Sequence, residues 1–232
     1  MNNIKSLLLL STLIVSTNIN AALLTRLGGL AYYDDVANLT WLADANYAQT
    51  QYAISGGTEG DLDGLMFWAE ATSWVSTLNV AGVTGWRLPD TVDIGNDGVT
   101  YTNFFQGVDA GYNFTATSEL SNMYYNILGN TPLVDVNGVR SNCTVPDFCL
   151  TERGPFSNLQ ANFYWSSTEY ILNPGRGWYF DMSTGFQFGN DEANLFYAWA
   201  VKSGDVSAVP LPAAVWLFCA GLFGLIRFAR LR

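Results

Sequence analysis

Two apolar segments, one at each end of the chain, limit the part of this sequence that can fold as a globular domain. The first, residues 1–21, has a lone Lys5, then an apolar stretch, and it ends in the small residue Ala21, which Ala22 follows. This order is typical of a secretory signal peptide, and the apolar stretch is shorter than the ~20 residues that a membrane-spanning helix needs. A retained N-terminal anchor is the alternative. With residues 209–232 also set aside, residues 22–208 have the length of one domain.

The charge of this middle part excludes one class of partner. All 20 Asp and Glu residues of the chain lie within residues 22–208, where only six Lys and Arg residues accompany them, so its formal charge is −14. Such a surface repels nucleic acids and other polyanions. We expect no nucleic-acid partner, and neutral or cationic partners fit better.

The chain contains no histidine. Ser-His-Asp and Cys-His catalysis are therefore excluded, and the commonest zinc ligand is missing. Two carboxylates can still serve a glycosidase when they lie ~5 Å or ~7–9 Å apart, but among 20 acidic residues some pairs reach these distances by chance. We expect a protein that is not an enzyme and requires no cofactor. An envelope enzyme that acts on polysaccharide through paired carboxylates is the alternative.

Two of the three cysteines lie close together in a loop. Cys143 and Cys149 flank a Pro-containing stretch, whereas Cys219 lies within the C-terminal apolar run. In an oxidising compartment the first two would close a small disulfide loop. A metal or redox pair is the competing interpretation, but no second cysteine pair accompanies them.

The C-terminal segment has the properties of a transmembrane helix. Residues 211–226 carry no charge, which is slightly short for a full span, and snorkelling of Arg227 can extend it. More arginines follow, and the positive-inside rule places them in the cytoplasm. The acidic domain would then face the periplasm, in agreement with the signal peptide.

The start of this segment adds a second signal. A Val-Pro-Leu-Pro element, an apolar helix and a basic end resemble the PEP-CTERM sorting signal, with Leu211 in place of the usual Glu, as in its VPLPA subtype. The residues that carry the resemblance are Val209, Pro210, Leu211, Pro212, Arg227, Arg230 and Arg232. The resemblance implies export by the Sec machinery, transient residence in the inner membrane, processing by an exosortase near residues 210–212, and sorting to the envelope surface or the exopolysaccharide matrix. A purely structural, membrane-anchored surface protein is the alternative.

Apolar periodicity predicts two main helices in the middle part. Apolar residues at intervals of three and four predict a helix over 65–79. Its buried stripe would comprise Leu65, Trp68, Thr72, Val75 and Leu78. A second helix is predicted over 118–128, capped by Ser118 and ended by Gly129.

The remaining patterns predict strands. Runs near 30–33 and 39–42 form a hairpin around an Asp-Asp-Val-Ala-Asn turn. Four aromatic-rich runs separated by turn residues, within 163–170, 176–185, 186–190 and 195–204, predict antiparallel strands late in the chain. Two helices followed by antiparallel strands give a single α+β domain.

The order of five short motifs resembles a known family. These are Trp-Ala-Glu-Ala at 68–71, Gly-Trp-Arg-Leu-Pro at 85–89, Tyr-Trp-Ser-Ser-Thr-Glu at 164–169, Gly-Trp-Tyr-Phe at 177–180 and Ala-Trp-Ala-Val-Lys at 198–202. Together they are similar to the Lcl C-terminal-type domain, over residues 30–202. The resemblance implies a fold like that of C-type lectins and formylglycine-generating enzymes, and adhesion to glycans. The reactive cysteine pair of the latter enzymes is not carried over to Cys143 and Cys149.

Candidate binding residues follow from the aromatic and acidic groups. Indoles at loop edges provide flat platforms for sugar rings, although alternating Trp and Tyr on strands usually fill a core. The glycan-binding candidates are Trp165, Glu169, Trp178, Asn190, Asp191 and Glu192. We expect Trp86 to lie in the core and Arg87 to pair with a buried acid.

One acidic loop is a candidate calcium site. Ca²⁺ takes about six to eight oxygen ligands, which Asp/Asn/Gly loops supply. Asp90, Asp93 and Asp97 are the candidate ligands, although no EF-hand spacing is present. A solvated acidic loop without a metal is the alternative.

Overall fold

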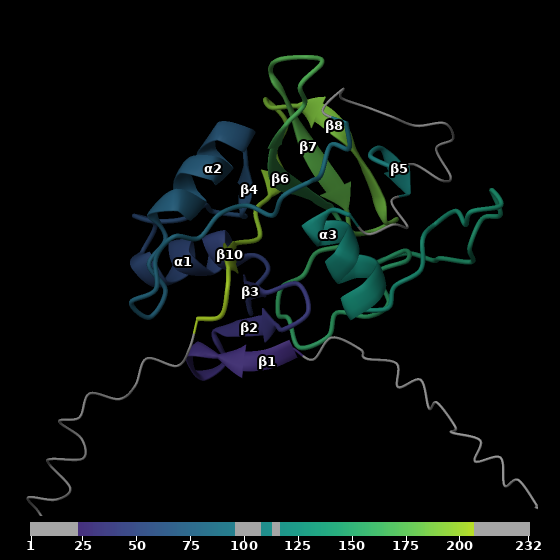
Figure 1. Ribbon diagram of the computed structural model, residues 1–232. Helices are drawn as coiled ribbons and strands as arrows, with labels where there is room; N and C mark the ends of the chain where they lie inside the picture. Colours follow the sequence, from purple (N-terminus) through teal and green to yellow (C-terminus); the bar gives the residue numbers. More distant parts are fainter. Residues whose placement is uncertain (1–22, 96–107, 113–116, 207–232) are drawn as a thin grey trace, which may run out of the picture.

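Within the residues that the structure describes, two β-sheets and three short α-helices share one aromatic core (Figure 1). The structure is a computed structural model, and it describes residues 23–95, 108–112 and 117–206. The predicted α+β class is confirmed.

The first sheet contains the predicted hairpin. Its strands are β1 (Leu23–Arg26), β2 (Ala31–Asp34), β3 (Leu39–Leu42) and β10 (Val201–Ser203), in the order β1-β2-β3-β10 and antiparallel throughout. A short 3₁₀ turn, η1 (Leu27–Gly29), joins β1 to β2. The Asp34 carboxylate closes the hairpin by accepting the backbone N–H groups of Val36 and Ala37, both at 3.0 Å. Because β10 pairs with β3, the last described strand lies beside a strand from the beginning of the domain.

The second sheet has six strands. They are β4 (Leu65–Met66), β9 (Phe196–Tyr197), β6 (Phe163–Glu169), β7 (Arg176–Asp181), β8 (Phe186–Asp191) and β5 (Gly111–Tyr112), in the order β4-β9-β6-β7-β8-β5. The first three aromatic-rich runs form the antiparallel β6-β7-β8 unit, as predicted. The fourth run differs from the prediction, because it divides into β9, which lies parallel to β6, and β10, which belongs to the other sheet.

The helices only partly follow the predicted ranges. Helix α1 (Tyr47–Ser55) was not predicted, because Ala48 is its only buried residue and no apolar stripe marks it. Helix α2 (Trp68–Thr77) begins three residues later than predicted, because Leu65 and Met66 pair with β9 instead.

The second predicted helix is present in two parts. Helix α3 (Glu119–Asn122) continues into a π-helical turn, η3 (Met123–Ile127). The chain leaves it through Gly129, whose φ of 74° favours glycine. Ser118 occupies the N-cap position but makes no side-chain cap hydrogen bond.

Helices α2 and α3 pack against opposite faces of the second sheet (Figure 1). The indole of Trp68 in α2 lies over Gly177 of β7, where a Cβ atom would be 2.7 Å from the ring. Tyr124 and Tyr125 of η3 contact Phe180 of the same strand, with ring centroids 5.4 and 6.4 Å apart. Because side chains alternate along a strand, positions 177 and 180 face opposite sides.

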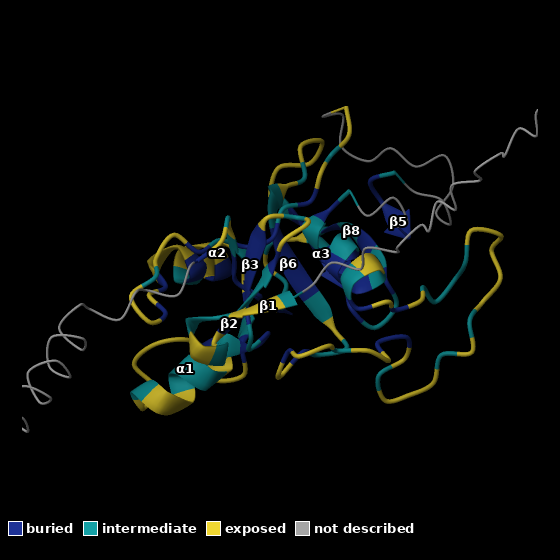
Figure 2. Ribbon diagram, turned by 60° about the horizontal axis from the view of Figure 1, so that its bottom comes forward, coloured by how far each residue is buried: buried dark blue, intermediate teal, exposed yellow. Residues whose placement is uncertain are grey.

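Trp199 joins the two sheets. Its ring lies 4.8 Å from that of Trp41 in β3 and 6.2 Å from that of Tyr164 in β6, centroid to centroid. Its Nε1–H group donates to the carbonyl of Leu42 at 2.9 Å. Strands β3 and β6 therefore lie at the buried centre of the molecule, while α1 has exposed residues on its outer side (Figure 2).

Candidate functional site

A groove lies between α2, α1 and the loop that follows α1, which are neighbours in Figure 1. It consists of two adjoining pockets of about 510 and 540 Å³ that share Gly60 and Trp74. The first pocket is also lined by Asp61, Met66, Ala69, Glu70 and Ser73, and the second by Gln51, Glu59, Thr77 and Asn79. We call this surface the Trp74 groove.

The amphipathic character of α2 produces one wall of the groove. Ala71, Val75 and Leu78 are buried in the core, whereas the small residues Ala69, Ser73 and Thr77 follow one another on the exposed side at intervals of four. Small side chains at these positions leave open space beside Trp74.

One residue of the predicted buried stripe is misplaced. Thr72 is exposed rather than buried, and its hydroxyl donates to the carbonyl of Trp68 at 2.9 Å. Ala71 takes the buried position in its place.

Hydrogen bonds fix the indole of Trp74. Its Nε1–H group donates to Oε1 of Gln51 at 2.8 Å, and Nε2 of Gln51 donates to Oε2 of Glu59, also at 2.8 Å. This relay connects α2, α1 and the following loop. The indole is partly exposed, so part of its ring surface faces the groove in a fixed orientation.

The loop that follows α1 packs closely against that helix. The N–H group of Asp61 donates to the carbonyl of Ala48 at 3.1 Å. Gly60 has a φ of 78°, and a Cβ atom there would lie 2.1 Å from the same carbonyl oxygen. Only glycine fits this approach, so the loop holds its carboxylates in a defined place.

Three carboxylates line the groove. Glu70 accepts the N–H group of Phe67 at 3.1 Å through Oε2, at the beginning of α2, and Glu59 accepts Gln51 through Oε2. Among the described residues, the second oxygen of each of these two side chains accepts no hydrogen bond. Asp61 accepts the N–H groups of Asp63 and Gly64 through Oδ1, at 3.1 and 2.9 Å.

Burial raises the pKa of Asp61, and the nearby carboxylate of Asp63 raises it further. None of the described residues that line the groove is basic. The arrangement offers a flat apolar ring beside acceptors and hydroxyl groups, and it attracts positive charge.

The predicted tryptophan platforms require correction. Trp165 and Trp178 are both 0% exposed, so neither ring can contact a ligand at the surface. Trp165 stacks on Phe196 with ring centroids 4.4 Å apart, and its Nε1–H group donates to the carbonyl of Met66 at 2.8 Å. Strand alternation turns these indoles into the core, and the partly exposed indole of the groove, that of Trp74, lies on α2 instead.

The predicted polar candidates lie at the ends of neighbouring strands. Glu169 of β6 pairs with Gly177 of β7, which in turn pairs with Asn190 of β8, and Asp191 and Glu192 follow. Burial raises the pKa of Glu192, and the charges of Glu169 and Asp191 raise it further. The side-chain oxygen of Asn190 accepts the N–H group of Asp191 at 2.9 Å. None of these four residues lines the Trp74 groove.

Arg87 pairs with an acidic side chain, as predicted, although this acid, Glu119, is partly exposed rather than buried. Its Nη1 and Nη2 atoms donate to the two carboxylate oxygens of Glu119, both at 2.7 Å, and this raises the pKa of the guanidinium. Nη1 also lies 3.3 Å from Asp90. Trp86 is buried beside it, with 3% of its surface exposed.

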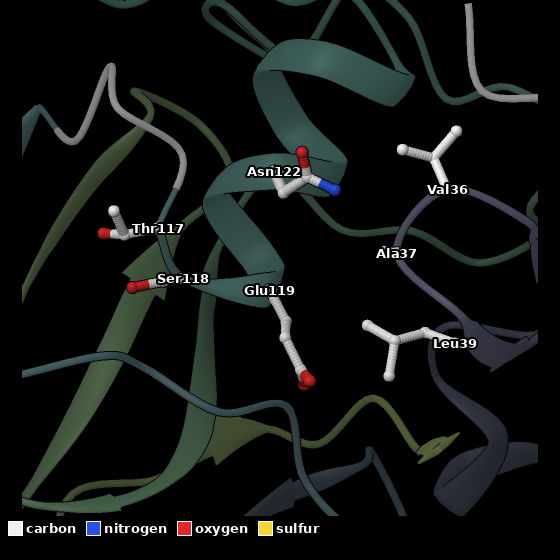
Figure 3. A pocket seen from close by; sticks show the side chains of 7 residues that line it. All are labelled: Val36, Ala37, Leu39, Thr117, Ser118, Glu119 and Asn122. Carbon is white, nitrogen blue, oxygen red and sulfur yellow. The ribbon is translucent and has the colours of Figure 1, made fainter. Parts of the chain in front are cut away.

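A third pocket adjoins this ion pair (Figure 3). It has a volume of about 320 Å³ and is lined by Val36, Ala37, Leu39, Thr117, Ser118, Glu119 and Asn122. Its only charged side chain, Glu119, already accepts Arg87 and the N–H group of Asp90, the latter at 2.8 Å. This pocket therefore offers a ligand less than the Trp74 groove does.

The proposed calcium ligands are only partly described. Asp90 pairs with Arg87 and accepts the hydroxyl of Ser167, and Asp97 lies outside the described residues. Within residues 23–95, 108–112 and 117–206, no three His, Cys, Asp or Glu side chains come together as a metal-binding group. Calcium binding by Asp90, Asp93 and Asp97 stays a prediction.

The predicted disulfide is present. Cys143 and Cys149 are bonded, with their Cα atoms 5.0 Å apart. Cys149 is buried, and its N–H group donates to the carbonyl of Ser183 at 2.9 Å, so the disulfide loop is attached to the turn between β7 and β8.

Two predicted segments lie outside the described residues. They are the signal peptide, residues 1–21, and the sorting signal with Val209, Pro210, Leu211, Pro212, Arg227, Arg230 and Arg232. In the part of the chain that the structure describes, no helix has both the length and the apolar character needed to cross a membrane.

Comparison with known proteins gives one match. The family model of the Lcl C-terminal domain matches residues 31–202. Neither the curated proteins nor the solved structures that were searched contain a significant match. The matched segment begins at β2 and ends in β10, so it leaves out β1 but includes the rest of the first sheet, the whole second sheet, helices α1 to α3 and the Trp74 groove. Because it covers well over half of the sequence, this chain belongs to the Lcl C-terminal domain family.

Proposed function

We propose that this chain is a non-enzymatic surface protein that binds neutral or amino-bearing glycan, such as exopolysaccharide of the surrounding matrix, in the Trp74 groove. The observation that carries the proposal is the partly exposed indole of Trp74, held in place by Gln51 and surrounded by carboxylate, amide and hydroxyl groups. Aromatic faces pack on sugar rings, and polar groups around them bind the hydroxyls.

The predicted export of the chain agrees with this proposal. The disulfide between Cys143 and Cys149 fits an oxidising compartment. The signal-peptide and PEP-CTERM-like segments then predict passage through the inner membrane, exosortase processing, and a final place at the envelope surface or in the extracellular matrix. A C-type-lectin-like fold, which the family resemblance implies, would suit this role.

Binding to a glycan panel tests the proposal. The domain is expected to bind at least one neutral or amino-bearing oligosaccharide without cleaving it, and Trp74→Ala is expected to weaken this binding about tenfold or more, because stacking energy is lost. Trp74→Phe, which keeps an aromatic face, should retain part of the affinity. Tyr33→Ala, which removes a half-buried aromatic side chain from β2, is the matched control.

Three outcomes would contradict the proposal. Cleavage of the bound glycan would establish the enzymatic alternative. Failure to bind any glycan would favour a purely structural surface protein. Binding that Trp74→Ala leaves unchanged would place the glycan site elsewhere, with the polar group around Glu169 as the next surface to test.

A further inference from the structure

We propose that the Trp74 groove selects polysaccharides that carry free amino groups, such as partly de-N-acetylated amino-sugar polymers. This inference rests on the proposed function, because it names the class of glycan that the same groove would bind. The carrying observations are the positions of three carboxylates around one indole and the lack of basic side chains among the described residues that line the groove.

The carboxylates lie on both sides of Trp74. The pocket on one side contains Glu59, the pocket on the other side contains Asp61 and Glu70, and the indole lines both. A chain of sugar rings that stacks on the indole and occupies both pockets would therefore meet at least one carboxylate in each of them. A protonated amine on a neighbouring ring can form an ion pair with such a carboxylate, which a neutral acetamide cannot.

The free oxygens of these carboxylates point to the same ligand class. Glu59 and Glu70 each use one oxygen to hold the local structure, through Gln51 and the N–H group of Phe67. The second oxygen of each has no hydrogen-bond partner among the described residues. Both side chains are exposed, so a cationic donor can reach these oxygens without disturbing the contacts that build the groove.

The surface of the whole domain favours the same choice. Residues 22–208 carry a formal charge of −14, so an anionic polysaccharide would be repelled before it reached the groove. A basic peptide would also be attracted. A sugar fits better because Ser73, Thr77 and Asn79 supply hydroxyl and amide groups in the groove, and these pair with sugar hydroxyls.

Calorimetric titration with two probes tests the inference. The probes are a glucosamine hexamer and the N-acetylglucosamine hexamer, at a pH where the amines are protonated and the carboxylates are ionised. The glucosamine hexamer is expected to bind about tenfold more tightly, and its affinity should fall as ionic strength rises, because salt screens the charge pairs. Binding of the N-acetylated hexamer should depend little on salt.

Two variants that keep the shape of the side chain locate the effect. Glu59→Gln and Glu70→Gln should each reduce the preference for the glucosamine hexamer by about threefold to tenfold and leave binding of the N-acetylated hexamer unchanged. Each glutamine can still accept the hydrogen bond that its glutamate accepts in the fold, so thermal unfolding should not change. Glu152→Gln, which removes an exposed carboxylate outside the groove, should leave the preference unchanged.

The outcomes separate this inference from the proposed function. Equal affinity for the two hexamers would overturn the inference and leave glycan binding in place. Failure of both hexamers and of every other glycan would overturn both. Oligolysine that binds as tightly as the glucosamine hexamer, with the same loss in Glu59→Gln, would replace the sugar by a basic peptide as the ligand.

Discussion

At the scale of single residues, Arg87 connects segments that lie far apart in the chain. Its guanidinium forms two hydrogen bonds with Glu119 at the beginning of α3, and its backbone N–H and C=O groups both pair with Val201 of β10, at 2.8 and 2.9 Å. The side chains of Arg87 and Glu119 are 29% and 18% exposed, so solvent screens this pair only partly. Arg87 thus joins α3 to β10 of the first sheet.

Loss of this ion pair should destabilise the fold. We expect Arg87→Ala to lower the free energy of unfolding by about 2 kcal/mol, because the Glu119 carboxylate keeps its partly buried position without its partner. Arg87→Lys should recover less than half, since an ammonium cannot form the two-point contact. Urea unfolding measures both. Arg140→Ala, at an exposed position, is the control, and its free energy of unfolding should stay within ~0.5 kcal/mol of that of the parent chain. A similarly small effect of Arg87→Ala would contradict the stabilising role of the pair.

The tryptophans show how much of the candidate site could be predicted from the sequence alone. Alternation in the late aromatic runs located the strands that contain Trp165 and Trp178 correctly, yet it could not tell which face of each strand is covered by a helix. Both faces of the second sheet are covered, so both indoles are buried. Trp74 was missed because its exposure depends on the loop after α1, which packs against α1 through Gly60. No periodicity in the local sequence reports that contact.

At the scale of elements, the contact between α2 and β7 depends on one glycine. Trp68 donates from Nε1 to the carbonyl of Ser166 in β6 at 2.8 Å, and its indole occupies the space above Gly177. The helix can approach the sheet this closely because position 177 has no side chain. The sequence pattern over 65–79 therefore predicted the helix but not where it packs on the sheet. That position depends on Gly177, a residue about 100 positions later in the chain.

A methyl group at position 177 should disturb the packing of α2 on β7. The added Cβ of Gly177→Ala would lie 2.7 Å from Cδ1 of Trp68, so the indole must move and its hydrogen bond to Ser166 must stretch. We expect the free energy of unfolding to fall by ~1–3 kcal/mol, together with a change in near-ultraviolet circular dichroism. In a Trp68→Phe background, whose ring is smaller, the same substitution should cost less than half as much. An equal cost in both backgrounds would show that the indole is not the obstacle.

At the scale of the whole molecule, the predicted processing and the disulfide can be measured together. If the C-terminal segment is a sorting signal, protein recovered from the medium should end near residue 210, and reduction should increase its mass by about 2 Da for one disulfide. Intact-mass analysis of the membrane and medium fractions gives both values. A stable membrane form that retains Arg232, with no shorter form in the medium, would make the segment a plain anchor.

Tyrosines that are buried in the core or partly buried against it should set the alkaline limit of the fold. Burial raises the pKa of Tyr124, Tyr125, Tyr164 and Tyr179, the last to about 12. The folded state holds these protons more tightly than the unfolded chain, in which a tyrosine has a pKa of ~10. Their contribution to stability is therefore complete below pH ~10 and is lost as the pH rises toward 12.

Alkaline titration tests this expectation. The phenolate absorbance of these four residues should appear only together with loss of the near-ultraviolet circular dichroism, because the core must open before they ionise. Tyr179→Phe removes one such group, so the pH of half-unfolding should rise relative to that of the parent chain after the change in stability at neutral pH is taken into account. Ionisation of all tyrosines near pH ~10 with an unchanged spectrum of the folded state would mean that the core admits solvent to these hydroxyls.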